Sequence, residues 1–259
     1  MSAAPVRVSL GGARVDLVDR AGLLDTVRDR LLAPRQVPLY VVSANLDHIH
    51  HFGSGASGAL PTPTAAGAEW LVVLDGMPLV WTARRLTRLA WEQLAGSDLL
   101  PELLQRADTL HARLGVLGGS PAMHAALRPL LAERYPGIEV AGLWSPGRAE
   151  VDDAQGALRL ADEVRRAGVD LLVVGLGKPR QEEWLAGAGA ASGAKVALAF
   201  GASFDFLTGT VRRAPARWSR LGLEWLHRLL SEPRRLYRRY LLHGPRDVAT
   251  LLRASHLGP

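Results

Sequence analysis

Cysteine is absent from the 259-residue sequence. Its absence excludes a disulfide scaffold, a zinc site with thiolate ligands and a cysteine nucleophile, and it fits a reducing compartment. No apolar run approaches the roughly 20 residues that a membrane-spanning helix needs, and the first residues lack the continuous apolar core of a signal peptide. We therefore expect a soluble protein that is located in the cytoplasm.

The standard nucleotide fingerprints are also absent. The glycine-rich segment GVLGGSPAM (115–123) lacks the spacing of a dinucleotide site, and no segment matches a phosphate-binding loop that ends in Lys-Ser or Lys-Thr. No Asp-x-Asp motif for a nucleotide-bound cation occurs. The segment DHIHH (47–51) holds four possible metal ligands, but their spacing matches no established site. We expect a protein that needs neither a metal nor a cofactor.

Acidic residues are scarce near the C-terminus. Between Arg212 and Arg246 ten arginines accompany only two glutamates, a balance of +8, so the remaining residues carry −2 of the net charge of +6. Such an arginine-rich segment usually binds phosphate on a nucleic acid, a lipid head group or a nucleotide. The sequence thus predicts a near-neutral core, residues 1–211, followed by a basic helical appendage, residues 212–259.

The appendage has the pattern of two amphipathic helices that are separated at Pro233. Each helix has aromatic and leucine residues on one side and arginines on the other. Basic amphipathic helices of this kind suit an anionic membrane surface. A terminal helix that packs on its own core and exposes a solvated basic face is the alternative. Few aromatic residues are placed to stack on bases, so we expect no nucleic-acid partner.

Short apolar runs alternate with helix-length segments through the core. The runs lie at residues 37–44, 69–75, 113–119, 137–144, 169–177 and 194–201, and helical patterns lie at 78–90, 97–109, 121–135, 152–167 and 180–191. Apolar runs with little alternation are typical of a parallel sheet that helices cover on both faces. Ahead of them, VRVSLGGARVDLV predicts a β-hairpin across a Gly-Gly turn. We expect a Rossmann-like α/β fold, with a mostly parallel sheet and an N-terminal hairpin.

Small and polar residues follow the predicted strands, where ligands bind in such sheets. They are Ser43-Ala44-Asn45, Asp75-Gly76, Gly118-Gly119-Ser120, Gly175 to Glu182, and Gly201 with Asp205. Glycine lets the backbone approach a ligand closely, and the N–H groups that begin a helix favour an anion. Asp75 could act as a base here, although Asp-Gly is also a common way to end a strand.

Seven segments of the sequence together resemble a known protein family. They are VVSANLDHI (41–49), LDGMPLVW (74–81), AGSDLLPEL (95–103), GLGKPRQEEW (175–184), GASFDFLTG (201–209), RRAPARW (212–218) and GLEWLHRLLSEPRRLYRRY (222–240). In this order, and over most of the chain, they resemble the WecG/TagA/CpsF family of bacterial glycosyltransferases. The Pro-Arg-Gln-Glu block together with the arginine-rich tail is the specific part of this pattern.

The resemblance implies an inverting transfer of an N-acetylmannosamine-type sugar from a UDP-sugar to a prenyl-diphosphate-linked saccharide. Members of the family make teichoic acid linkage units, enterobacterial common antigen and capsular polymers, so the implied setting is polysaccharide synthesis at the inner face of the cell membrane. The resemblance implies no metal and a tail that touches the bilayer. Two alternatives stay open: a non-catalytic relative of the family, and a nucleic-acid-binding protein with a basic tail.

The resemblance also gives roles to residues near the first two strand ends. Asp75 matches the proposed general base, which in an inverting transfer removes the proton of the acceptor hydroxyl. Ser43 stands where a threonine is usual, and Asn45 follows it at a position that can orient donor hydroxyls. Either Ser43 or Asn45 could instead cap a helix. Gln93 departs from the family, which usually has arginine there, so its phosphate contact is in doubt.

Further positions match the family's donor-binding residues. Gln181 and Asp205 match the residues that hold the uridine moiety. Because no cation motif offsets the charge of the departing UDP, arginines of the tail are expected to bind the diphosphate. The resemblance points first to Arg228, and then to Arg235 and Arg238.

Overall fold

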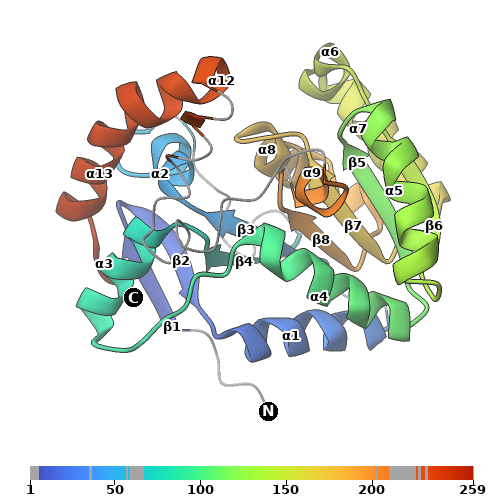
Figure 1. The fold of residues 1–259 in the computed structure, drawn as a ribbon, viewed down its shortest axis with the longest axis horizontal. Coiled ribbons are helices and arrows are strands. Elements are labelled where there is room, and N and C mark those ends of the chain that lie inside the picture. Colours follow the sequence, from blue (N-terminus) through green and yellow to red (C-terminus); the bar gives the residue numbers. More distant parts are fainter. Residues whose placement is uncertain are drawn as a thin grey trace.

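A six-stranded parallel sheet forms the centre of the molecule, with the strand order β4-β3-β8-β7-β5-β6 (Figure 1). The computed structural model describes residues 6–34, 37–56, 58, 67–201, 203–209, 226, 229–230 and 233–258. The six strands are β3 (Leu39–Ala44), β4 (Glu69–Leu74), β5 (Arg113–Gly118), β6 (Glu139–Trp144), β7 (Leu171–Gly175) and β8 (Val196–Ala199). Each lies within one of the six predicted runs, so the predicted α/β class is confirmed.

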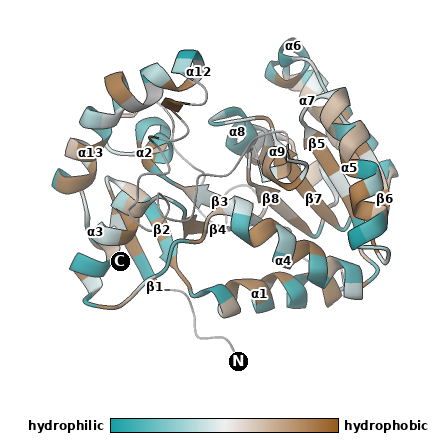
Figure 2. Cartoon of the chain, in the orientation of Figure 1, coloured by the Kyte–Doolittle hydropathy of each residue, from teal (hydrophilic) through white to brown (hydrophobic). Residues whose placement is uncertain are grey.

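Helices cover both faces of the sheet. One face packs against α1 (Arg20–Leu32), α4 (Gly96–Thr109), α5 (Pro121–Arg134) and α9 (Ser203–Leu207). The other packs against α2 (Leu46–Phe52), α3 (Met77–Thr87), α7 (Ala154–Arg166), α8 (Arg180–Gly187) and α13 (Gly244–Arg253). The short elements α6 (Arg148–Asp152) and the 3₁₀ helix η1 (Gly189–Ser192) adjoin α7 and α8. In Figure 2 strands such as β7 and β8 are largely brown, as buried strands should be.

The side chains of β3 show how the sheet divides the core. Leu39 and Val41 belong to the apolar cluster on the face of α1 and α4, whereas Tyr40, Val42 and Ala44 belong to the cluster on the opposite face. Alternate side chains of a strand point to opposite faces, so a strand covered on both faces must be apolar throughout. This is why the sequence shows continuous apolar runs here.

The predicted hairpin is present and leads into α1. Strands β1 (Val6–Leu10) and β2 (Ala13–Leu17) pair in the antiparallel register Leu10 to Ala13. Gly11 and Gly12 of the turn have φ of +58° and +83°, which glycine adopts without strain. After the hairpin, the Asp19 carboxylate accepts a hydrogen bond of 2.7 Å from the Gly22 N–H and caps α1.

The end of the chain packs on the hairpin. The two-residue strand β9 (His256–Leu257) pairs with β1, giving a second sheet of order β2-β1-β9. The Gly12 N–H donates to the Ala254 carbonyl at 2.8 Å, and helix α13 packs against α2. The division of the chain between residues 211 and 212 stays a prediction, but residues 244–258 are in contact with the N-terminal part of the fold.

The rest of the predicted tail is described only in part. Helix α12 (Pro233–Tyr237) begins at Pro233, the residue at which a break was predicted, and the π-helix η2 (Arg238–His243) follows it. Almost all of the first predicted tail helix lies outside the described residues. In the part of the chain that the structure describes, no helix is long and apolar enough to cross a membrane.

The strand order places a switch of chain direction between β5 and β7. From β5 the chain continues to β6 on one side, whereas from β7 it continues to β8 on the other side. In open α/β sheets a crevice forms beyond the carboxyl ends of the two strands at such a point, and ligands bind there. The topology therefore directs attention to the segments that follow β5, β7 and β8.

Packing of α13 can be tested with two adjacent leucines. Leu251 is 1% exposed and belongs to the core cluster, whereas Leu252 is 63% exposed. We expect Leu251→Ala to lower the free energy of unfolding by about 2–5 kcal/mol, because it leaves a cavity. Leu252→Ala should change it by less than about 0.5 kcal/mol. Urea unfolding measures both. Equal effects would show that α13 does not belong to the core.

Candidate active site

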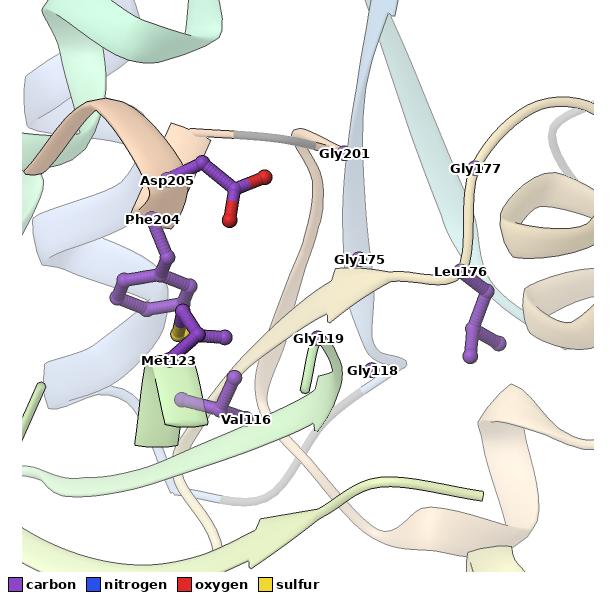
Figure 3. A pocket seen from close by; sticks show the side chains of 10 residues that line it. All are labelled: Val116, Gly118, Gly119, Met123, Gly175, Leu176, Gly177, Gly201, Phe204 and Asp205. Carbon is purple, nitrogen blue, oxygen red and sulfur yellow. The ribbon is translucent and has the colours of Figure 1, made fainter. Parts of the chain in front are cut away.

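A pocket of about 240 Å³ lies at the carboxyl ends of β5, β7 and β8 (Figure 3). Its lining residues are Val116, Gly118, Gly119, Met123, Gly175, Leu176, Gly177, Gly201, Phe204 and Asp205. Half of them are glycines, which leave backbone N–H groups open to a ligand. The pocket thus occupies the switch point between β5 and β7, where the topology predicts a ligand.

Gly118 shows why glycine is needed in this wall. Its φ is +108°, and a β-carbon built on it would lie 2.5 Å from the carbonyl oxygen of Gly175. A side chain at this position would therefore force the ends of β5 and β7 apart. The close approach of these two strand ends forms the floor of the pocket, next to which Asp205 extends from α9 (Figure 3).

Gln181 lies beside the same pocket. It is buried at the start of α8, and its Nε2 donates hydrogen bonds to the Ala199 carbonyl at 3.0 Å and to Glu182 Oε1 at 3.1 Å. Its Oε1 has no hydrogen-bond partner among the described residues, and a β-carbon built on Gly201 would lie 3.6 Å from that oxygen. Gln181 therefore lies close to Gly201, which lines the pocket together with Asp205. That these two residues hold the uridine moiety stays a prediction.

Asp75 and Asn45 meet at the ends of β4 and β3. Asn45 Nδ2 donates to Asp75 Oδ2 at 3.1 Å, while Asn45 Oδ1 accepts from the His48 N–H at 3.3 Å and caps α2. Capping and a contact with the candidate base are thus combined in one side chain. A β-carbon built on Gly76 would lie 3.2 Å from Asn45 Cβ, so glycine after Asp75 permits this approach.

The backbone of Asp75 is held in place from two sides. Its N–H donates to the Ala44 carbonyl at 2.8 Å, and its own carbonyl accepts a hydrogen bond from Gln93 Nε2. Gln93 therefore supports the loop that carries Asp75. Ser43 is buried within β3, paired with Val73 of β4. Its catalytic role stays a prediction.

The two groups of residues belong to one edge of the sheet. Asp75 follows β4, Gly201 follows β8, and β3 is the single strand between them. At about 4.8 Å between neighbouring strands, the two strand ends are about 10 Å apart. The glycine-lined pocket and the Asn45–Asp75 pair therefore lie along the same edge of the sheet.

A buried polar cluster lies between α2 and α8. Lys178 Nζ forms an ion pair with Glu182 and lies 3.4 Å from His48 Nδ1. All three side chains are almost completely buried. Burial and, secondarily, the neighbouring Lys178 and His51 lower the pKa of His48 well below its usual value, so the imidazole is neutral and can accept from the ammonium group.

Sequence reasoning misses this cluster. An acid in the first turn of a helix, such as Glu182, is expected only to complement the helix dipole. The available signal is the i, i+4 spacing of Lys178 and Glu182. Such a spacing does not by itself distinguish a buried ion pair from one that is exposed to solvent.

Comparison with known families shows which family the chain belongs to. Residues 8–257 match the family described as the glycosyl transferase WecG/TagA/CpsF family. The chain belongs to this family. Two relatives are N-acetylglucosaminyldiphosphoundecaprenol N-acetyl-beta-D-mannosaminyltransferases. That of Bacillus spizizenii (strain ATCC 23059 / NRRL B-14472 / W23) is 32% identical over 182 residues, 70% of this chain and 68% of the relative. That of Bacillus subtilis (strain 168) is 30% identical over the same shares.

The tail arginines of this family member are only partly placed. Arg228 and the side chain of Arg235 lie outside the described residues. Arg238 is exposed at the start of η2, and no contact with the pocket is seen for it. The role predicted for these three arginines therefore stays a prediction.

The histidine-rich segment after β3 is divided among different contacts. His50 Nδ1 lies 3.2 Å from Asp247 Oδ1 of α13, and His51 Nε2 lies 3.9 Å from Asp47. The rings of His50 and His243 are also in contact, tilted by 53° with centroids 4.4 Å apart. Among the residues that the structure describes, no three acidic or histidine side chains form a group that could hold a metal ion. Metal independence stays a prediction.

Burial of His48 predicts a pH dependence of stability. The unfolded chain binds a proton at His48 below about pH 6.5, whereas the folded chain does not, so stability falls as the pH drops through this range. We expect a contribution of about 1 kcal/mol per pH unit. Gln at this position keeps an acceptor for Lys178 but cannot titrate, so His48→Gln should flatten the acid limb. Urea midpoints at several pH values measure this effect. An unchanged acid limb would contradict it.

Proposed function

We propose that this protein transfers an N-acetylmannosamine-type sugar from a UDP-sugar to a prenyl-diphosphate-linked saccharide, with inversion at the anomeric carbon. Family membership and the names of the two Bacillus relatives support the sugar and the acceptor class. The observation that carries the proposal is the Asn45–Asp75 pair, because it puts an oriented carboxylate on the same sheet edge as the glycine-lined pocket.

The glycine-lined pocket is the proposed site of the donor nucleotide. Asp205 can accept hydrogen bonds from ribose hydroxyls, and the unpartnered Oε1 of Gln181 can accept from a donor group that enters beside Gly201. The backbone N–H groups of the glycine turns after β5 and β7 suit the diphosphate. In this pose the sugar lies along the edge toward β4.

Asp75 is the proposed general base. The acceptor hydroxyl attacks the anomeric carbon on the face opposite the leaving UDP while the Asp75 carboxylate takes the hydroxyl proton. The Asn45 amide donates a hydrogen bond to Oδ2 of this carboxylate. The amide N–H also fixes the plane of the carboxylate, as a base must have the correct direction before the reaction begins.

Arginines are the proposed counter-charge for the departing UDP. A guanidinium group can bind a diphosphate through two parallel N–H bonds and stabilise the charge that develops on it. Arg228, Arg235 and Arg238 are the candidates within the tail. The same segment is rich in arginine beyond these three, and we propose that its remaining charge attracts the anionic membrane in which the acceptor is anchored.

Asp75→Asn tests the proposed base. The amide keeps the shape and can still contact Asn45, but it cannot accept the proton, so the rate of transfer should fall about 10²–10⁴-fold. Affinity for UDP should stay nearly unchanged. The measurements are UDP release with a lipid-linked acceptor and calorimetric titration with UDP.

Asp205→Asn serves as the matched variant, since it replaces a carboxylate of the pocket. It should raise the KM for the UDP-sugar more than it lowers kcat. If Asp75→Asn turned over at the wild-type rate, Asp75 would not be the base and would serve only to end the strand. Wild-type protein that releases no UDP from any UDP-sugar would point to a non-catalytic relative.

Chelator treatment tests the proposed counter-charge. With arginine in the role that a divalent cation plays elsewhere, transfer should retain its rate in EDTA. The measurement is UDP release before and after chelation, with added Mg²⁺ or Mn²⁺ as the comparison. Loss of activity that either cation restores would contradict the proposal. The histidine-rich segment after β3 would then be a candidate for metal binding.

A further inference from the structure

Helix α3 exposes an aromatic and basic surface that the proposed reaction does not use. Trp81 is 53% exposed and Leu89 is 55% exposed. Arg84, Arg85 and Arg88 are exposed as well. Trp81, Arg84, Arg85 and Arg88 follow the i, i+3, i+4, i+7 spacing that places residues on one side of a helix. We call these five residues the α3 surface.

The α3 surface has no acidic residue. No Asp or Glu occurs from Gly76 to Trp91. In the described part of the chain, no carboxylate oxygen is within 4.0 Å of Arg84, Arg85 or Arg88. The neighbouring Glu92 pairs with Arg20 at 3.2 Å instead. A cationic surface of this kind is complementary to an anionic one.

Arg88 has a conformation that its side chain disfavours. It ends α3 with φ of +61°, a left-handed position that glycine usually occupies at the end of a helix. An arginine there costs free energy that glycine would not. Arginine thus occupies a position where glycine would make the protein more stable. Residues in such disfavoured conformations are often functional, which suggests that the positive charge of Arg88 binds an anion.

The surface continues onto the end of the chain. Helix α3 packs against α13 and β9, and the three lie on the same side of the molecule (Figure 1). Leu252 of α13 and Leu257 of β9 are 63% and 60% exposed. Exposed apolar side chains that are grouped with arginines and a tryptophan are typical of a surface that lies in a membrane interface.

We propose that the α3 surface is a second membrane contact, in the core itself, which binds the anionic head groups of the bilayer beside the tail. This inference rests on the proposed membrane association of the protein. Trp81 lies at the depth of the head groups, where its amphipathic ring is stabilised, and Arg85 and Arg88 pair with lipid phosphates. Helix α3 begins one residue after Gly76, so contact here brings the Asp75 loop to the membrane that holds the acceptor.

The test uses the full chain with Arg85→Gln and Arg88→Gly combined. Glycine suits the left-handed backbone at the end of α3, so the variant loses two charges without new strain. Arg84 is left in place because its Nε donates to the Trp91 carbonyl at 2.7 Å. At about 1 kcal/mol for each arginine, cosedimentation with phosphatidylglycerol–phosphatidylcholine vesicles should show a partition coefficient roughly 25–30-fold lower than that of the wild type.

The matched control changes the same charge elsewhere. Arg128 and Arg134 are exposed on α5, at the opposite end of the molecule from α3 (Figure 1). Arg128→Gln combined with Arg134→Gln should bind the vesicles like the wild type. The chain has seven tryptophans, two of them in the tail, so Trp81→Phe should reduce, but not abolish, the quenching by brominated lipid that the wild type shows. Transfer to a water-soluble acceptor analogue should be unchanged in all of these variants.

The outcomes separate the two proposals. Equal vesicle binding by the α3 and α5 double variants, below or at the wild-type level, would overturn the α3 contact. A wild type that does not bind anionic vesicles would overturn it together with the proposed membrane association. Absent transfer activity with vesicle binding that depends on Arg85 and Arg88 would refute the proposed reaction and support the α3 contact.

Discussion

The hydrogen bond of 3.1 Å between Asn45 Nδ2 and Asp75 Oδ2 is the contact on which the arrangement of the site depends. Asn45 lies between β3 and α2 and caps α2, so the same side chain holds the start of a helix and a carboxylate. The close approach requires glycine at position 76 and is held by the hydrogen bonds of Ala44 and Gln93 to the Asp75 backbone. A change in the packing of α2 is therefore transmitted to the proposed base. The contacts of α2 with α8 and with α13, through His48 and His50, are the places where this can happen.

Much of this framework can be predicted from sequence, because its signals are local. The apolar runs predict the six strands because both faces of the sheet are covered, and the glycines and acids that follow them mark the edge where the pocket lies. Gln181, Asp205, Asn45 and Asp75 are found in this way before any contact is known. Which of these residues contact one another cannot be predicted in this way, because the strand order decides which strand ends are neighbours. The hydrogen bond between Asn45 and Asp75 depends on β3 and β4 being adjacent.

The parts that escape sequence reasoning are those whose partners are distant or whose burial is atypical. Glu182 and Lys178 have the i, i+4 spacing of an ordinary surface ion pair, but both side chains are buried in the fold. Strand β9 has only two residues, too few to show an alternation of apolar and polar side chains. His256–Leu257 is therefore recognised as a strand only from its pairing with β1. The α3 surface is similar, because three arginines and a tryptophan in a helix are read as solvated side chains unless their neighbours on α13 and β9 are known.

The pairing of β1 with β9 has a consequence for how the chain is made. Val8 pairs with Leu257, so β1 can pair with β9 only after about 250 further residues have been made. At elongation rates of about 5–20 residues per second, the edge of β1 stays unpaired for roughly 12 to 50 s. An unpaired edge is a template for association with other chains, and a charged residue on it opposes such pairing. Arg7, whose side chain is 53% exposed, is a charged residue on β1.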